Sequence, residues 1–170
     1  MDARTARQAI RPVVRRLQQA VSCVSTAVAS YALEAPETYG VALRGQGPER
    51  RFVRLSDGSG LGLAAQYRVG TRAGGRGWAA TLTAYRYDLW DRDGREILSY
   101  HWHPFARSPV TTPHLHLGVG VASWRPELAT AHLPTGRVGL EDVLLLAIQG
   151  LGVPSLRDDW YTILAHNQES

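Results

Sequence analysis

The sequence predicts an α+β fold: one domain, residues 1–170, with an N-terminal helix, a mainly antiparallel sheet of five to six strands and two C-terminal helices. Three changes in pattern support this order. Apolar residues have helical spacing within 1–34, alternate with polar residues over 39–122, and return to helical spacing over 139–167. Helices on either side of a continuous run of strands are typical of a sheet that carries its helices on one face.

The composition is that of an ordinary globular protein. The 170 residues are 44% hydrophobic and 20% charged, which is enough for one domain with a core of its own. No stretch approaches the roughly 18 apolar residues of a membrane span, and the Arg-rich start does not resemble a signal peptide. Cys23 is the only cysteine, so an intrachain disulfide and a thiolate metal cluster are excluded. We therefore expect a cytoplasmic protein without a membrane partner.

The charge of the chain does not by itself determine whether its partner is a nucleic acid. The net charge is +4, and all nineteen basic residues are arginine. Arginine binds phosphate in a bidentate manner and stacks on bases, which would suit a nucleic-acid partner. The alternative is a GC-rich genome, whose codon usage replaces lysine by arginine throughout.

The first helix is predicted from a single apolar stripe. Pro12 suits a first helical turn, so we expect the helix to begin near Arg11 and to end before Pro36. The stripe consists of Val14, Leu17, Val21, Val24, Val28 and Tyr31. Such a stripe would pack on the protein's own sheet, or it would serve as a dimerisation or nucleic-acid helix. A homodimer through this helix is therefore one expected assembly.

The strands are predicted from period-two alternation between turn signals. They cover 40–45, 51–56, 61–69, 78–90, 97–103 and 114–121. Asp93-Gly94 indicates a two-residue hairpin turn, whose register pairs Leu89 with Leu98, Tyr87 with Tyr100 and Tyr85 with Trp102. That register also sets Arg92 opposite Arg95. A three-residue loop would shift it by one and turn the two tyrosines to the opposite face.

The C-terminal third is predicted to be helical. Leu140, Val143, Leu144, Ala147 and Ile148 have helical spacing, and Gly150 suits a helix end. Ser155 and Asp158 are spaced like a capping box for a last helix. The apolar side of that helix would consist of Leu156, Trp160, Ile163 and Leu164.

The candidate site lies in residues 99–118, SYHWHPFARSPVTTPHLHLG. This stretch holds four of the six histidines, as the pairs His101/His103 and His114/His116. Side chains two residues apart on a strand point the same way. If 114–121 pairs with 97–103, all four imidazoles share one face with Arg86 and Asp88. Gly118 and Gly120 beside them would leave room for a ligand.

Three interpretations of these histidines remain open. Three imidazoles would bind zinc or another borderline metal, with Asp88 as a ligand or as an acceptor that orients a ring. Without a metal, imidazoles would serve as acid and base in RNA cleavage, with Arg86 or Arg107 stabilising the phosphate. The third interpretation is an ordinary solvent-facing sheet surface. His132 would join the site or stay exposed.

Part of the chain resembles a known family. YRYDLWDRDGREILSYHWHP and TPHLHLG, with an apolar helix after them, are similar to TumE-like toxins of bacterial toxin–antitoxin modules, over residues 83–150. The resemblance implies a small cytoplasmic toxin that acts on RNA and is neutralised by a DNA-binding antitoxin. It also implies that Pro113, His114 and His116 carry the shared motif.

Together these observations predict a toxin-like enzyme that cleaves or modifies RNA. Its catalytic residues would be His101, His103, His114, His116, Arg86 and Asp88. The enzyme would need no cofactor, with a divalent metal such as zinc held by the four histidines as the alternative. The expected partners are RNA and a cognate antitoxin. Two alternatives stand beside this prediction: a non-catalytic, antitoxin-like binding module, and a histidine-ligated metalloprotein.

Overall fold

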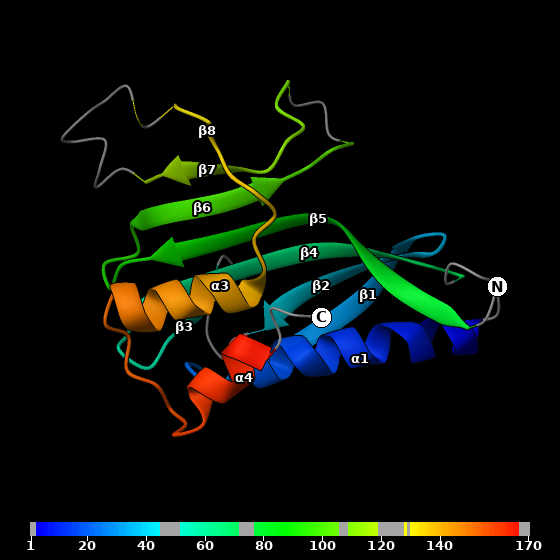
Figure 1. Ribbon diagram of the computed structural model, residues 1–170, viewed down its shortest axis with the longest axis horizontal. Helices are drawn as coiled ribbons and strands as arrows, with labels where there is room; N and C mark the ends of the chain where they lie inside the picture. Colours follow the sequence, from blue (N-terminus) through cyan, green and yellow to red (C-terminus); the bar gives the residue numbers. More distant parts are fainter. Residues whose placement is uncertain are drawn as a thin grey trace.

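The protein forms one large sheet with helices packed against one of its faces (Figure 1). The computed structural model describes residues 3–44, 52–71, 77–105, 109–118, 128 and 130–166. The elements are, in chain order, α1 (Ala3–Val21), β1 (Val28–Ala35), β2 (Thr38–Arg44), β3 (Val53–Arg54), β4 (Gly60–Thr71), β5 (Trp78–Trp90), β6 (Glu96–Trp102), β7 (His114–Leu117), β8 (Leu133–Pro134), α3 (Leu140–Leu145), a π-helical turn (Leu146–Gly150) and α4 (Trp160–His166).

Within the described residues, eight strands form the sheet. The order is β1-β2-β4-β5-β6-β7-β8, with β3 paired to β4, and every neighbouring pair is antiparallel. The predicted α+β fold is therefore confirmed. The number of strands is higher than the predicted five to six, because β1 was expected to be helical and the two-residue β8 was not expected.

The N-terminal helix differs from the prediction at both ends. It begins at Ala3 rather than near Arg11, with Pro12 inside it, and it ends at Val21. Residues 28–34, which were expected to continue the helix, belong to β1. The segment VSTAV at 24–28 explains the early end, because β-branched residues and serine are weak helix formers. No helix in the described parts of the chain is long and apolar enough to cross a membrane.

Gln18 fixes the passage from α1 to β1. Its side-chain amide donates to the carbonyl of Ala27 at 3.0 Å and accepts from the amide of Ala29 at 2.7 Å. The chain is thus held in an extended conformation one turn after the helix ends. Val28, which the prediction placed on the helical stripe, is consequently 58% exposed on the outer strand of the sheet.

The core lies between the helices and one face of the sheet. α1 contributes Leu17 and Val21, the sheet contributes Leu61, Tyr87 and Leu89, and the C-terminal segments contribute Leu140, Leu144 and Leu164, all at most 2% exposed. The stripe on α1 is therefore used by the protein's own core. This confirms the first of the two interpretations of the stripe and leaves these side chains unavailable for a dimer.

The β5–β6 hairpin combines the two registers considered from the sequence. Gly94, with a φ of 78°, closes a three-residue loop in which the amide of Asp91 donates to the carbonyl of Arg95. A β-bulge next to Leu89 then compensates for the change in loop length, so that Tyr85 still pairs with Trp102. The predicted pairing of large side chains is confirmed. The opposition of like charges is avoided, because Arg95 forms an ion pair with Asp91 at 3.0 Å.

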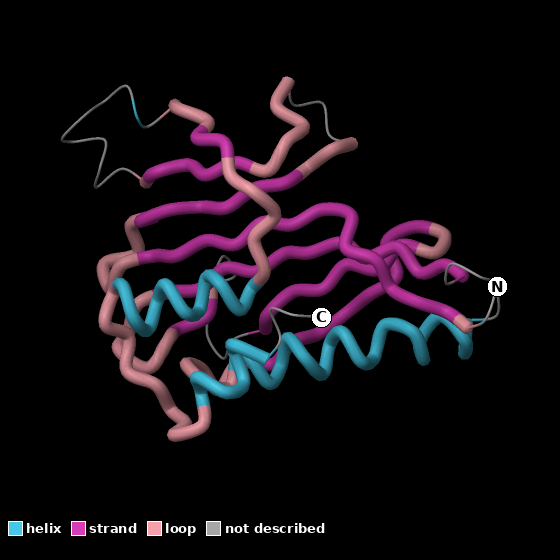
Figure 2. Tube along the Cα trace, in the orientation of Figure 1, coloured by secondary structure: helices cyan, strands magenta, loops and turns pink. Residues whose placement is uncertain are grey.

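The last helix is shorter than predicted. It begins at Trp160, and the expected capping box does not form, because the hydroxyl of Ser155 accepts from the amide of Arg157. Leu156 consequently lies before the helix and is 52% exposed, whereas Leu164 is fully buried as predicted. Figure 2 shows α4 and α3 on the same side of the sheet as α1, so that none of the described helices covers the opposite face of the sheet, which we call the uncovered face.

Candidate functional site

Two rows of side chains cross the uncovered face of the sheet. The strand register aligns Ser30, Ala42, Ala64, Arg86, His101 and His114 in one row. The next row holds Gly62, Asp88, Ser99 and His116. The predicted pairing of β7 with β6 is thus present, and it places the histidines of both strands on the face that also carries Arg86 and Asp88.

The imidazole rings form a continuous cluster. The ring centroid of His101 lies 5.3 Å from that of His103, 5.7 Å from that of His114 and 4.9 Å from that of His116. His132, which precedes β8, extends the cluster, because its ring lies 5.0 Å from that of His114 and 4.5 Å from that of His116. Five imidazoles therefore meet: three come from β6 and β7, one from the residue directly after β6 and one from the residue directly before β8.

Three of the five imidazoles converge more closely than the others. One nitrogen from each of His101, His114 and His116 lies within 4.8 Å of the other two. His103 and His132 flank this group on either side. Asp88 is not part of it: its Oδ1 lies 3.9 Å from Nε2 of His101, which makes the carboxylate a neighbour of the ring rather than a member of the convergent group.

Ser99 connects Asp88 to His101. Its hydroxyl donates to Oδ1 of Asp88, and its oxygen lies 2.5 Å from Nε2 of His101. Serine has a single hydroxyl proton, and a carboxylate can only accept. With that proton directed to Asp88, Nε2 of His101 must be the donor to Ser99, and Nδ1 keeps its lone pair. The buried pair Asp88–Ser99 therefore fixes both the orientation and the tautomer of this imidazole.

The orientation of His114 is fixed by the backbone. Nδ1 of His114 lies 2.8 Å from the carbonyl oxygen of Thr112, which can only accept a hydrogen bond. Nδ1 therefore carries the proton, and Nε2 keeps its lone pair. The side chain is 3% exposed. The backbone at Thr112 thus holds the buried imidazole of His114 with one nitrogen available to a ligand.

The cluster disfavours protonation. Burial lowers the pKa of His101 to about 3, assisted by the nearby positive charge of Arg86 and by the neighbouring imidazoles. Burial also lowers the pKa values of His103 and His116, and surrounding imidazoles add to the effect. These three rings are consequently neutral near pH 7, and each offers a lone pair.

Arg86 lies beside the cluster but is engaged by carboxylates. Its Nε lies 2.8 Å from Oδ1 of Asp88, and its Nη2 lies 3.5 Å from Oε2 of Glu96. Burial, followed by the charge of Asp88, raises the pKa of Glu96. Arg86 thus balances the charge of the carboxyl groups of Asp88 and Glu96, in addition to any role toward phosphate. Arg107, the other predicted phosphate-binding cation, lies outside the described residues.

Gly118 does not make room for a ligand as predicted. A Cβ at this position would collide with the carbonyl oxygen of Glu96, because the amide of Gly118 donates to the carbonyl of Ile97 at 2.8 Å. Glycine is required here by the close approach of the two backbones. The predicted extension of this strand through Gly120 to residue 121 lies outside the described residues.

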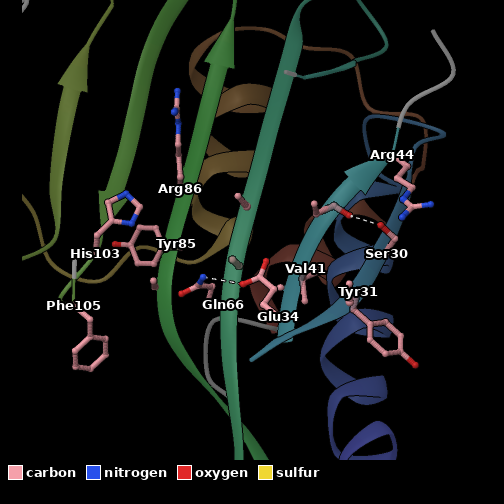
Figure 3. A pocket seen from close by; sticks show the side chains of 16 residues that line it. Ser30, Tyr31, Glu34, Val41, Arg44, Gln66, Tyr85, Arg86, His103 and Phe105 are labelled. Atoms are coloured by element: carbon pink, nitrogen blue, oxygen red, sulfur yellow. Dashed lines mark hydrogen bonds between the residues drawn. The ribbon is translucent and has the colours of Figure 1, made fainter. Parts of the chain in front are cut away.

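A groove of about 560 Å³ leads to the cluster along the uncovered face. Its floor is made of the small residues Gly40, Ala42, Ala64 and Ala84. Figure 3 shows Arg44 and Tyr31 at the β1–β2 side of this groove, with His103 and Phe105 at the opposite side. Phe105 is 79% exposed. The groove and the cluster share His103 and Arg86.

No family model, curated protein or solved structure matches the chain.

Sequence reasoning placed six residues at this site and left two without a role. All four predicted histidines, Arg86 and Asp88 lie together. Ser99 had been placed on the correct face, but nothing in a lone serine indicates that it would bridge a carboxylate and an imidazole. His132 was left undecided, because it lies 16 residues beyond His116 in a segment without a periodic pattern.

Proposed function

We propose that the histidine cluster is the active site of an enzyme that acts on RNA, and that the chain is a toxin-like protein of a bacterial toxin–antitoxin module. The carrying observation is that His103 and Arg86 line both the cluster and the groove. A strand of RNA in the groove would bring a phosphate next to neutral imidazoles. The likeness of residues 83–150 to TumE-like toxins supports the same function.

The cluster contains the groups that RNA cleavage requires. The 2′-oxygen attacks phosphorus while the bond from phosphorus to the 5′-oxygen breaks. One imidazole takes the proton of the 2′-hydroxyl, and a second donates a proton to the departing 5′-oxygen. His103 is suited to the first role, because its lowered pKa keeps it unprotonated near neutral pH. His132, which is exposed on the other side of the convergent group, is suited to the second.

The groove is suited to a single strand. Arg44 is exposed at one side and offers a guanidinium to phosphate, whereas Phe105 offers an exposed ring on which a base can stack. Ala42, Ala64 and Ala84 between them leave part of the sheet face open to a flat ligand, beside Glu34, which lies over Gly40 and accepts a hydrogen bond from Gln66 at 2.8 Å. Single-stranded RNA is recognised in this manner, by aromatic stacking combined with cationic contacts to the backbone.

The test is a cleavage assay on purified protein without a histidine tag. A synthetic single-stranded RNA is incubated with the protein and analysed by mass spectrometry, which detects both cleavage and covalent modification. We expect His103→Ala to lower the rate by about 10²–10⁴-fold, the usual contribution of general acid–base catalysis. Arg44→Ala weakens RNA binding. Arg68→Ala is the matched control, because Arg68 is exposed on the same face but does not line the groove.

The same assay contradicts the proposal if the cluster proves dispensable. His101→Ala, His103→Ala, His114→Ala and His116→Ala are made singly, and each variant is checked for its fold by circular dichroism. Full activity in all four would exclude the cluster as the active site. An absence of any change in the RNA with the wild-type protein would exclude an RNA-acting enzyme.

A second function, partner binding, is favoured by the outer strand β1. Val28 and Leu33 are 58% and 63% exposed on this strand, which pairs, among the strands that the structure describes, with β2 alone. An exposed apolar edge can accept a strand from a partner such as an antitoxin. Leu33→Glu would then abolish co-purification with the product of a neighbouring gene and leave the RNA assay unchanged. Co-purification that survives this substitution would exclude β1 as the interface.

A further inference from the structure

We propose that His101, His114 and His116 form a binding site for one divalent metal ion of the zinc class, with a fourth coordination position open to solvent. This inference goes beyond the proposed function, since it concerns what the cluster binds and holds whether or not RNA is the substrate. It also gives the five imidazoles different roles. Three of them bind the metal ion, whereas His103 and His132 do not.

The spacing of the three nitrogens is close to that of a metal site. They lie within 4.8 Å of one another. Zinc–nitrogen distances of about 2.0–2.1 Å in a tetrahedral arrangement place two bound nitrogens roughly 3.4 Å apart. The three nitrogens therefore need to approach by at most about 1.4 Å, which small rotations of side chains can supply. No movement of β6 or β7 is required.

The backbone that carries the three ligands is firmly paired. His101 of β6 lies directly opposite His114 of β7, and Ser99 lies opposite His116. The close approach of Gly118 to Glu96 holds the two strands together beyond the site. A site with ligands on neighbouring strands of a sheet is more precisely fixed than one with ligands on loops.

Two of the three ligands have the outer contacts that metal-binding imidazoles usually make. A histidine that binds a metal through one nitrogen generally donates its other N–H to a carboxylate, a carbonyl or a water molecule. His114 donates Nδ1–H to the carbonyl of Thr112. His101 donates Nε2–H to the oxygen of Ser99, and the hydroxyl of Ser99 in turn donates to Asp88. Each ring is thus held with one lone pair available.

The donor set indicates the class of metal. Three imidazoles without a carboxylate in the group favour zinc, cobalt or copper over magnesium or calcium, which prefer oxygen ligands. Three protein ligands leave a tetrahedral ion with one position for water or substrate, as in catalytic zinc sites. His103 and His132 lie beside the group, next to His101 and His116 respectively.

The two flanking imidazoles provide matched controls. His103 directly follows β6, the strand that carries His101, and its ring lies 5.3 Å from that of His101. His132 lies 4.5 Å from the ring of His116. Neither belongs to the convergent group. Removal of either one therefore changes the histidine content by the same amount as removal of a ligand, but it leaves the three metal-binding nitrogens in place.

The test is a titration of the full chain, purified without a histidine tag and freed of metal with EDTA, with zinc chloride in a calorimeter. We expect one zinc ion per chain. His101→Ala, His114→Ala and His116→Ala should each lower the affinity by more than about 100-fold, which exceeds the usual 10–100-fold cost of losing an outer contact. His103→Ala and His132→Ala should change the affinity by less than about tenfold.

A second measurement uses the wild-type protein alone, so it tests the proposal even if the variants fail to fold. X-ray absorption at the zinc edge of the wild-type protein should show about three imidazole nitrogens at 2.0–2.1 Å. Wild-type protein that binds no stoichiometric zinc would overturn the proposal, as would a spectrum without imidazole scattering. Equal losses of affinity in the flanking variants and the ligand variants would also overturn it. All these measurements omit RNA, so a metal site without RNA cleavage would contradict the proposed function alone.

Discussion

The oxygen of Ser99 lies 2.5 Å from Nε2 of His101, and its proton is directed to the buried carboxylate of Asp88. This relationship distinguishes His101 from an ordinary surface histidine, because a buried carboxylate and a hydroxyl hold its ring. The carboxylate of Asp88 accepts from the hydroxyl of Ser99, which in turn contacts the imidazole of His101. These contacts fix the tautomer of one ring at the centre of the cluster. The same three residues also bring Arg86 to the site through its ion pair with Asp88.

The first prediction concerns Ser99. Ser99→Ala removes the hydroxyl that orients His101 while the ligand itself remains. We expect zinc affinity to fall about 10–100-fold, the usual cost of losing an outer contact to a metal-binding histidine. The measurement is calorimetry with zinc chloride. Ser30→Ala serves as the control, because Ser30 lies in the row of His101, next to that of Ser99, but at the far end of the sheet. Unchanged affinity in Ser99→Ala would show that the hydroxyl does not position the ring.

The second prediction concerns Gly118. Gly118→Ala forces β7 away from the carbonyl of Glu96, so we expect a loss of about 1–3 kcal/mol in the free energy of unfolding, as for other overpacked sites. Denaturant titration measures this loss. Gly136→Ala is the matched control, because nothing lies within 4 Å of a Cβ at that position. Equal stability of the two variants would contradict the close approach of the strands.

The third prediction concerns acid sensitivity of the metal-free protein. The pKa of His101 is lowered from 6.5 to about 3, chiefly by burial. Between these values the unfolded chain binds a proton that the folded chain does not, so protonation favours unfolding. The contribution of His101 to stability is therefore complete above its unfolded pKa and is lost as the pH falls toward 3.

Denaturation in urea with EDTA, at about pH 7.5 and about pH 5, measures this effect. The wild-type protein should lose more stability between the two conditions than His101→Asn, which has no titrating group at this position. Identical losses in the two proteins would mean that His101 is not held in its neutral form by the fold.

The fourth prediction concerns the groove. Ala64 lies on its exposed floor, in the same row as Arg86 and His101. Ala64→Tyr should fill the groove and raise KM for RNA by at least about tenfold, which corresponds to about 1.4 kcal/mol of binding free energy. Zinc affinity should be unchanged, since the substitution is remote from the three nitrogens. Thr81→Tyr, on an exposed part of β5 outside the groove, is the control. Normal KM in Ala64→Tyr would exclude the groove as the path of the substrate.

Much of the site could be predicted, because it depends on the period of two along strands. Alternation, combined with the register expected for the Asp93-Gly94 hairpin, placed Arg86 and Asp88 on the same face as His101. The pairing of large residues such as Tyr85 and Trp102 supported that register. The register remained correct although the loop was longer than expected, since the bulge compensates for the additional residue. Cross-strand packing therefore determined the pairing more strongly than the turn did.

The errors have physical causes of a different kind. Val24, Val28 and Tyr31 repeat at helical spacing by coincidence, and only the side-chain contacts of Gln18 with Ala27 and Ala29 reveal the start of a strand. Ser99 and His132 owe their roles to three-dimensional contacts that leave no trace in local spacing. The role of Gly118 follows from the approach of a second backbone, which a single sequence does not display.

The central claim is that His101, His114 and His116 hold a metal ion on the uncovered face of the sheet. An anomalous difference map from a crystal of the full chain soaked in zinc chloride, recorded at the zinc absorption edge, tests it most directly. The account predicts one peak bonded to these three imidazoles at about 2.0–2.1 Å, with His103 and His132 unbound. A map without a peak in the cluster, or with a peak bonded to another set of side chains, would contradict it.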